Sequence, residues 1–276
     1  MKTLSLQRAF EPWLLTVTAH AALVDAIASL APKNYMENGD DDCAPAPDYT
    51  LRGDGVAVLP INGVTCLRPS NLEKNYFGMT CLDEIGSAMD RAMKDPMVSA
   101  LVLQFNSPGG TANGSPEFAD KVRAFADKKP VVAFTDSMMA SAAYQAGSQA
   151  NVIIATRSAA VGSIGSVISY LDVSKAYENM GMERKVISND GAIYKGMGAV
   201  GAKLTPEQEA QLQRVVNTHG EMFKRMVTER RPRVQEDAMR GQTLVGNDAL
   251  SAGLIDQVGG LDLAIKTASG MRGMRR

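Results

Sequence analysis

A serine nucleophile is the first chemistry that the sequence suggests. Ser141 lies in a stretch of mostly small residues, 136–147, which follows the apolar run Val131–Phe134. This pattern predicts a strand that leads into a helix N-terminus, where free N–H groups and the helix dipole stabilise developing negative charge. The alternative is a structural role, in which Ser141 is one of several small residues that let a buried helix pack closely.

A second stretch could stabilise an oxyanion. Residues 106–110 read Asn-Ser-Pro-Gly-Gly and follow the apolar run 98–105. Pro108 restricts φ, whereas Gly109 and Gly110 can adopt backbone conformations that turn their N–H groups toward a ligand oxygen. An oxyanion hole needs preorganised donors of this kind. The alternative is a plain turn between a strand and a helix.

A serine hydroxyl becomes a good nucleophile only when a base takes its proton. The chain has two histidines, His20 and His219, and neither lies in a stretch that carries a motif. A lysine can replace histidine when burial lowers its pKa from about 10.4 toward neutrality. Lys195 lies near Ile193, Tyr194 and several glycines and alanines, which predicts partial burial. The alternative is an ordinary surface lysine.

The composition is that of an ordinary globular protein with a buried core. The formal net charge of −1 over 276 residues provides no general attraction to nucleic acid or to an anionic membrane. The cysteines are odd in number and form no CxxC pair, so we expect neither a disulfide framework nor a zinc site. The uncharged runs are too short, or too often interrupted by polar residues, to predict a secretory signal or a membrane span.

Alternating strands and helices are expected to position the candidate residues. Apolar runs predict strands at 55–61, 98–105, 131–134 and 151–155, and a further strand is expected at 183–188. Apolar residues at helical spacing predict helices at 81–93, 116–127, 171–180, 205–231 and 261–268. Such alternation indicates βαβ units and a mostly parallel α/β sheet, in which sites lie beyond the carboxyl ends of the strands. Thr205 and Pro206 suit the N-cap and the first position of the longest helix.

Five stretches together resemble the Ser–Lys peptidases of the signal peptide peptidase A family. They are residues 106–110, 140–144, 161–165, 193–195 and 243–260. Each stretch is weak evidence alone, but all five occur in the family's order within about residues 55–268. The resemblance implies a Clp-protease/crotonase-like fold with repeated ββα units, and a serine peptidase that uses no cofactor and no metal.

The resemblance also implies a role for each site residue. Ser141 would attack a peptide carbonyl and form an acyl-enzyme, and Lys195 would be the general base that later activates water. Ser163 would donate or accept a hydrogen bond that orients the lysine. The oxyanion would be held by N–H groups of Gly109 or Gly110 and of Ala142.

Two positions depart from the family's pattern. Many members have glycine after the nucleophile, where this chain has Ala142 and Ala143, and the larger side chains could narrow the substrate cleft. The family often has aspartate before Ser-Pro-Gly-Gly, whereas this chain has Asn106 there, which is the residue that Clp proteases have. A Clp-type mechanism would need a histidine after the nucleophile, and residues 142–218 contain none.

The opening residues 4–15 resemble the phage and prophage branch of the family, whose members are head-maturation proteases. This implies a capsid or scaffold protein as substrate, a homo-oligomer, and a location in the cytoplasm of a bacterial host or within a phage procapsid. The family suggests rings whose subunits share active sites, and the helix from residue 205 offers a surface for such contacts.

The chain is expected to divide into four parts. Residues 1–35 form an N-terminal helical segment, and residues 36–50 are a linker rich in acidic residues and proline. Residues 51–270 form the Ser–Lys peptidase domain, and residues 271–276 are a basic tail.

Two other functions stay open: a crotonase-like acyl-CoA enzyme, and a non-catalytic assembly component of the same fold.

Overall fold

The computed structural model describes residues 13–15, 48–53 and 55–271. The predicted N-terminal helix, most of the linker and the basic tail beyond residue 271 lie outside the described residues. No helix within the described ranges is both long enough and apolar enough to cross a bilayer.

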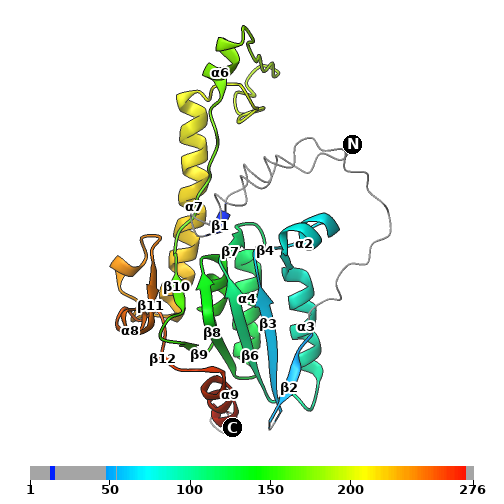
Figure 1. Ribbon diagram of the computed structural model, residues 1–276, viewed down its shortest axis with the longest axis vertical. Helices are drawn as coiled ribbons and strands as arrows, with labels where there is room; N and C mark the ends of the chain where they lie inside the picture. The colour runs from blue at the N-terminus through cyan, green and yellow to red at the C-terminus, as the bar shows by residue number, and fades with distance from the viewer. Residues whose placement is uncertain (1–12, 16–47, 54, 272–276) are drawn as a thin grey trace.

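A mostly parallel sheet forms the centre of the molecule (Figure 1). Its strands lie in the order β11 (Thr243–Val245), β10 (Ala160–Gly162), β8 (Val131–Ala140), β6 (Ala100–Ser107), β3 (Val56–Asn62) and β2 (Thr50–Arg52). The four inner strands are parallel, whereas β2 and β11 pair antiparallel at the two edges. β9 (Val152–Ala155) pairs with the first half of β8 and with β12 (Gln257–Val258). The expected mostly parallel α/β architecture is confirmed.

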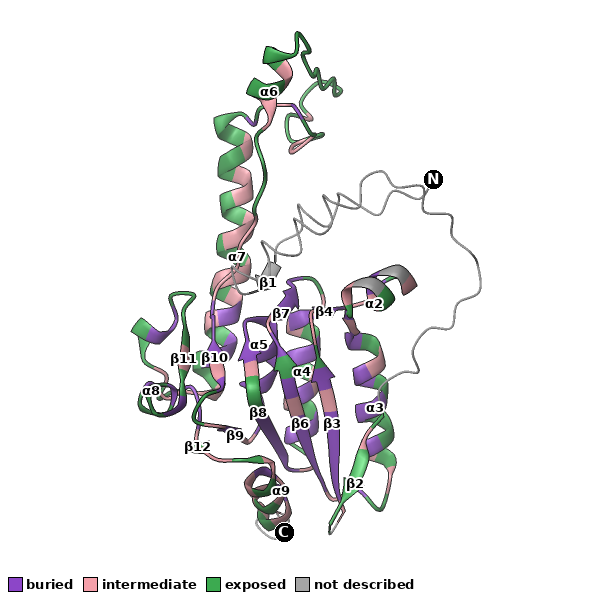
Figure 2. Cartoon of the chain, in the orientation of Figure 1, coloured by how far each residue is buried: buried purple, intermediate pink, exposed green. Residues whose placement is uncertain are grey.

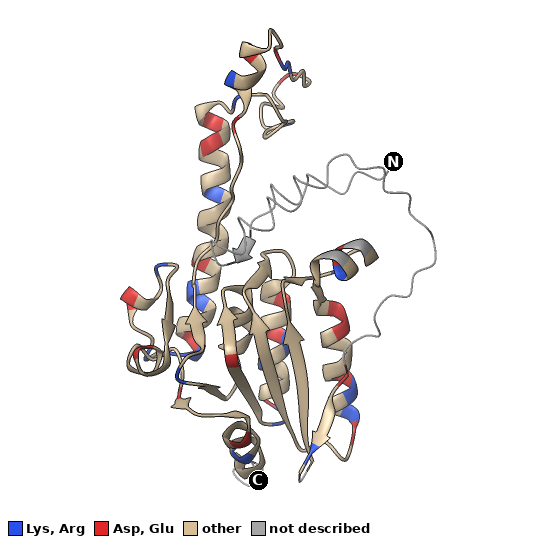
Figure 3. Ribbon diagram, viewed as in Figure 1, with Lys and Arg blue, Asp and Glu red and all other residues tan. Residues whose placement is uncertain are grey.

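Helices cover both faces of this sheet because successive side chains of a strand point to opposite sides. Ala57 and Leu59 of β3 pack in one core with α3 (Leu82–Lys94) and α4 (Ser115–Ala126). Val56 and Val58 pack in a second core with α9 (Leu261–Gly270). The strands of the sheet carry few charged residues, and most charges lie on the helices and connecting segments (Figure 3).

A smaller sheet lies at the carboxyl ends of the parallel strands. Its order is β1 (Trp13–Leu15), β7 (Gly109–Thr111), β4 (Thr65–Cys66) and β5 (Thr80–Cys81). The nearby helix α2 (Asn71–Phe77) begins with a capping box between Ser70 and Glu73. Cys66 and Cys81 lie opposite each other in the β4–β5 pair and are not joined by a disulfide.

After β10 the chain leaves the domain and forms a projecting arm, residues 166–205, which includes α6 (Ser174–Asn179). It returns along the 25-residue helix α7 (Pro206–Arg230). Thr205 is the N-cap, and its side chain accepts a hydrogen bond from the N–H of Gln208, so the predicted start is confirmed. Figure 2 shows that the arm is largely exposed, and α7 has buried residues only toward its C-terminal end.

The last segment completes the domain with a short 3-10 helix, η2 (Glu236–Ala238), then β11, α8 (Gly246–Ser251), β12 and α9. α9 extends to Gly270, slightly beyond the predicted 261–268.

The prediction of a strand at 183–188 is wrong. These residues form neither strand nor helix, and Ile187 is 94 % exposed. Val186 and Ile187 favour a strand, but no neighbouring strand of the described chain offers backbone partners, and strand formation depends on pairing as well as on propensity. The strand predicted at 131–134 is longer than expected, because β8 continues through Ala140. The helix predicted at 171–180 is shorter and begins at Ser174.

Candidate active site

Ser141 is the single residue between β8 and the helix α5 (Ala142–Gly147). Its φ of 54° and ψ of −120° are uncommon for a residue with a side chain. The N–H of Ser141 donates to the carbonyl of Gly162 at 2.7 Å, and its carbonyl accepts from the N–H of Gln145 at 2.8 Å. Backbone conformations of this kind cost about 1–3 kcal/mol, persist where the surroundings impose them, and cluster at functional sites.

The hydroxyl of Ser141 has no hydrogen-bond partner among the described residues, although the residue is 1 % exposed. A buried polar group without a partner is costly and therefore rare. α5 is fully buried, so its small residues do serve close packing, as the structural alternative proposed. Packing alone explains neither the positive φ of Ser141 nor its unpaired hydroxyl.

Ser163 directly follows β10, the strand next to β8, as Ser141 directly follows β8. The register of β8 and β10 pairs Ala140 with Gly162, so each serine is the next residue beyond that pair. Ser163 has a φ of 55° and is buried, and its N–H donates to the carbonyl of Gln242 at 2.7 Å. The structure therefore brings together two of the predicted site residues.

The two glycines predicted to hold an oxyanion begin β7, which packs against α5. Gly109 has a φ of 110°, and its N–H donates to the hydroxyl of Ser107 at 3.2 Å. A Cβ at Gly110 would lie 1.8 Å from the carbonyl oxygen of Thr65. Both positions require glycine, and the N–H of Gly109 would have to leave Ser107 to bind an oxyanion.

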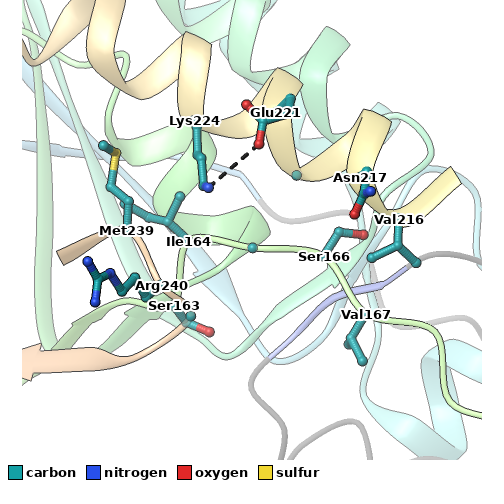
Figure 4. Close-up of a pocket in the computed structure, with 13 residues that line it drawn as sticks. Ser163, Ile164, Ser166, Val167, Val216, Asn217, Glu221, Lys224, Met239 and Arg240 are labelled. Atoms are coloured by element: carbon teal, nitrogen blue, oxygen red, sulfur yellow. Dashed lines mark ion pairs between the residues drawn. The ribbon is translucent and has the colours of Figure 1, made fainter. Parts of the chain in front are cut away.

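A cavity of about 330 Å³ lies next to Ser163 and is lined by the chain after β10 and by one face of α7 (Figure 4). The hydroxyl of Ser166 is buried in this region and has no hydrogen-bond partner among the described residues. Lys224 of α7 lines the cavity, and its Nζ lies 3.6 Å from a carboxylate oxygen of Glu221.

Sequence reasoning did not single out Lys224. A lysine three residues after a glutamate on a helix is the ordinary pattern of a solvated surface, so no local signal distinguished it. Only the packing of α7 beside the end of β10 places it at the cavity with Ser163.

Lys195 lies in the projecting arm, and the prediction that it is partly buried is wrong, because the residue is exposed. It lines a second cavity, of about 230 Å³, with Leu204 and Thr205. The side-chain Nε2 of Gln208 donates to the carbonyl of Ile193 at 2.7 Å and ties the lysine loop to the first turn of α7. The many glycines around Lys195 form turns that leave its side chain in solvent.

The segment that carries Ser141 contacts the opposite end of α7. Nε2 of Gln149, just after α5, donates to the carbonyl of Met226 at 3.1 Å. Gln208 and Met226 are eighteen residues apart, which is about 27 Å along a helix with a rise of 1.5 Å per residue. The structure therefore does not bring Lys195 to Ser141 within one chain.

An ion pair holds the C-terminal end of α5. The guanidinium of Arg231 donates to the carbonyls of Ser148 and Ala150 at 3.1 and 3.0 Å, and to the Asp256 carboxylate at 2.7 Å. The hydroxyl of Tyr144 donates to the carbonyl of Leu254 at 2.8 Å, and burial raises the pKa of Tyr144. These contacts fix the helix that follows Ser141 in its orientation.

Comparison with known proteins identifies the family of the chain. The model of peptidase family S49 matches residues 123–275, a range that includes Ser141, Ser163 and Lys195. The chain is 29 % identical over 236 residues to capsid assembly protease C of Escherichia phage lambda, covering 85 % of this chain and 52 % of that protein. It is 30 % identical over 231 residues to protease 4 of Salmonella typhi, covering 80 % of this chain and 36 % of that protein.

The chain thus spans about half or less of the length of these curated relatives. Among solved structures, an enoyl-CoA hydratase from Shewanella pealeana matches with a TM-score of 0.48 and 14 % identity, over 84 % of this chain and 75 % of that one. The predicted resemblance to the signal peptide peptidase family and its phage branch is confirmed by the family match and the two relatives. Because the family model covers more than half of the chain, the chain belongs to peptidase family S49.

Proposed function

We propose that the protein is a serine endopeptidase in which Ser141 is the nucleophile and Lys195 of a second copy is the general base. The observation that carries this proposal is Ser141 itself: a buried hydroxyl with no partner among the described residues, at a φ of 54° at the end of β8. Membership of peptidase family S49 supports the reaction class. The similarity to capsid assembly protease C of phage lambda supports a capsid or scaffold protein as substrate.

The reaction follows from the chemistry of these groups. The amine of Lys195 takes the proton of the Ser141 hydroxyl while the hydroxyl oxygen attacks a peptide carbonyl. N–H groups of the β7 glycines and of Ala142 bind the oxyanion that forms. The ammonium then gives its proton to the leaving amine, and the acyl-enzyme is hydrolysed by water that Lys195 activates. Ser163 is the hydroxyl next to Ser141 and would orient the incoming amine.

A second copy is required because one chain keeps the two residues apart. The contacts of Gln208 and Gln149 place the lysine loop and α5 at opposite ends of α7, about 27 Å apart. The arm also exposes large apolar side chains, among them Leu171 at 81 % and Met180 at 61 %. Exposed apolar groups that gather on one projecting segment are typical of an interface, so the arm is a suitable device to carry Lys195 into a neighbouring subunit.

Lys224 is the competing base. It belongs to the same chain as Ser141 and lines the cavity that also contains Ser163. Its ion pair with Glu221 would have to open before the amine could accept a proton. A base within one chain and a base from a neighbouring chain make different predictions for mixtures of inactive variants.

The test is complementation between variants on a phage capsid or scaffold protein, followed by intact mass. Ser141→Ala and Lys195→Ala proteins are each expected to be inactive. In a co-expressed 1:1 mixture, about a quarter of the sites combine an intact serine with an intact lysine from different subunits, so activity should return to about that fraction. The Lys224→Ala protein should stay active.

Three results would contradict the proposal in distinct ways. An active Ser141→Ala protein would mean that another nucleophile is used. The base would be Lys224 of the same chain if three results held together. The Lys195→Ala protein would be active, the Lys224→Ala protein would be inactive, and a mixture of Lys224→Ala with Ser141→Ala would stay inactive. Inactivity of the wild type on capsid, scaffold and unfolded protein substrates would favour the non-catalytic assembly component. The acyl-CoA alternative receives no support from the family match.

A further inference from the structure

The N-terminal part of the chain occupies a strand edge at the candidate active site. β1 pairs antiparallel with β7, in a register that sets Leu14 opposite Gly110 and Leu15 opposite Gly109. These are the two glycines assigned to the oxyanion. β1 and β7 lie next to each other above the parallel sheet, far in sequence but adjacent in space (Figure 1).

The other edge of β7 is closed. β7 pairs there with β4, where Gly110 stands opposite Thr65. The 1.8 Å separation between a Cβ at Gly110 and the Thr65 carbonyl oxygen shows that the two backbones approach as closely as glycine allows. A strand has two edges for hydrogen bonding, so only the edge that β1 occupies could receive another strand.

A peptide substrate needs such an edge. A peptidase must hold the scissile carbonyl near both its nucleophile and its oxyanion donors, and an added strand does this through main-chain hydrogen bonds that do not depend on sequence. β7 contains Gly109 and Gly110 and packs against α5, the helix that follows Ser141. The outer edge of β7 is therefore the edge along which an extended substrate chain can meet both groups.

We propose that Trp13–Leu15 is an internal competitor of the substrate: it occupies the outer edge of β7 and must leave before a substrate strand can bind. The proposal rests on the proposed function, since it takes Ser141 as the nucleophile. A Ser141 that is 1 % exposed agrees with a covered site. The β1–β7 ladder has three residue pairs, so it supplies few main-chain hydrogen bonds and a longer substrate strand can replace them.

The chain has one tryptophan, Trp13, and it lies in β1, so tryptophan fluorescence reports on this strand alone. The experiment uses the full-length Ser141→Ala protein, which needs no catalysis. The probe is a synthetic peptide with the sequence of residues 8–20 in which phenylalanine replaces the tryptophan. Binding of the probe should displace β1, so the fluorescence anisotropy of Trp13 should fall saturably with probe concentration.

A second variant tests the same edge from the other side. Successive N–H groups of a strand point to opposite edges, so one of Leu14 and Leu15 has its N–H toward β7. Proline has no N–H, so Leu14→Pro together with Leu15→Pro removes that donor. With both proline substitutions added, the Ser141→Ala protein should bind the probe at least tenfold more tightly than it does without them. The matched control carries Ala28→Pro and Ser29→Pro, outside β1, and should bind the probe like the parent.

In proteins that retain Ser141, the Leu14→Pro/Leu15→Pro variant should react with a fluorophosphonate at Ser141 at least fivefold faster. Unchanged Trp13 anisotropy at probe saturation, or equal probe affinity in the double variant and its control, would overturn the proposal. Absence of probe binding to every variant would do the same. If the Ser141→Ala protein still cleaves substrate, the proposed function fails, whereas the displacement result stands on its own.

Discussion

Ser141 and Ser163 are the first residues beyond the same pair of a parallel ladder, Ala140 and Gly162, and both have a positive φ, of 54° and 55°. Among the described residues they are the two positions other than glycine with this conformation. Two neighbouring parallel strands therefore end in the same uncommon way, and their serines lie side by side. Strain that occurs twice at one sheet end, at two hydroxyl-bearing residues, marks the place where chemistry is expected.

The hydroxyl of Ser141 should matter for activity and not for stability. Ser141→Ala should lower kcat by at least about 10⁴-fold, as expected when a nucleophile is removed. Its melting temperature should not fall, because the hydroxyl has no partner to lose among the described residues. Ser141→Gly should raise the free energy of unfolding by up to about 1 kcal/mol, because glycine tolerates this φ. Peptide hydrolysis and thermal unfolding of the same preparations check both statements.

Ser163 should act as a positioning residue for the lysine. Ser163→Ala should lower kcat about 10- to 100-fold, the effect of losing one hydrogen bond to a charged group. A positioning role also predicts that the pH at which kcat is half-maximal moves, which a purely structural role would not cause. Ser163→Thr keeps a hydroxyl and should restore the pH profile in part. A pH profile identical in wild type and Ser163→Ala would argue against contact with the base.

Gly110 should tolerate no side chain. Gly110→Ala should lower the free energy of unfolding by about 1–3 kcal/mol or more, because its Cβ meets the backbone of Thr65 at 1.8 Å, and backbone cannot yield as a side chain can. The matched control is Gly220→Ala in α7, where nothing lies within 4 Å of the added Cβ. That variant should be as stable as the wild type or more stable by up to about 1 kcal/mol, as alanine favours helix. Urea unfolding compares the two.

Tyr144 should give stability a dependence on alkaline pH. Burial raises the pKa of Tyr144 above its ordinary value of 10.0, so the folded protein keeps the proton after the unfolded chain has lost it. Stability from this group is complete below pH 10 and declines as pH rises above 10, since the folded state then binds more protons than the unfolded state. Tyr144→Phe should lose about 1 kcal/mol at pH 7, because the hydrogen bond to Leu254 is lost.

The comparison of urea unfolding at pH 8 and pH 10.5 checks this statement. The difference in stability between wild type and Tyr144→Phe should shrink at the higher pH. A difference that is constant across this range would mean that the Tyr144 hydroxyl is solvated in the folded protein.

The arm should be needed for association. Ile187 is 94 % exposed, so Ile187→Glu leaves the fold of a single chain intact and places a charge in any interface that the arm makes. Sedimentation should show smaller particles, with at least tenfold lower activity. Met97→Glu is the control, because Met97 is 68 % exposed in the connection between α3 and β6, outside the arm. Equal particle size and activity in the two variants would mean that the arm is not needed for association.

Much of the peptidase domain could be predicted from the sequence because the signals are local. The apolar runs at β3, β6 and β8 and the helical spacing of α3 and α4 depend on residues a few positions apart. The start of α7 was predicted from Thr205 and Pro206, because capping is decided within one turn. The position of Ser141 at the end of a strand was predicted for the same reason.

The tertiary structure decided what depends on residues far apart. Residues 183–188 were expected to form a strand, but they have no partner strand among the described residues, so they stay in the arm without regular structure. The cavity that Lys224 and Ser163 both line, and the pairing of β1 with β7, depend on where the chain returns, which no local pattern contains.

The sequence by itself determined which residues have the chemistry: a serine at a strand end, paired glycines and a lysine in a turn. It left open which of them meet, because a spacing of 54 residues between Ser141 and Lys195 is compatible with contact or with separation. The chain leaves the domain after Ser163 and returns along α7, and the contacts of the lysine loop and of the segment after α5 lie about 27 Å apart along that helix. The reason is physical: propensity and periodicity are set by neighbours in sequence, whereas distance is set by packing.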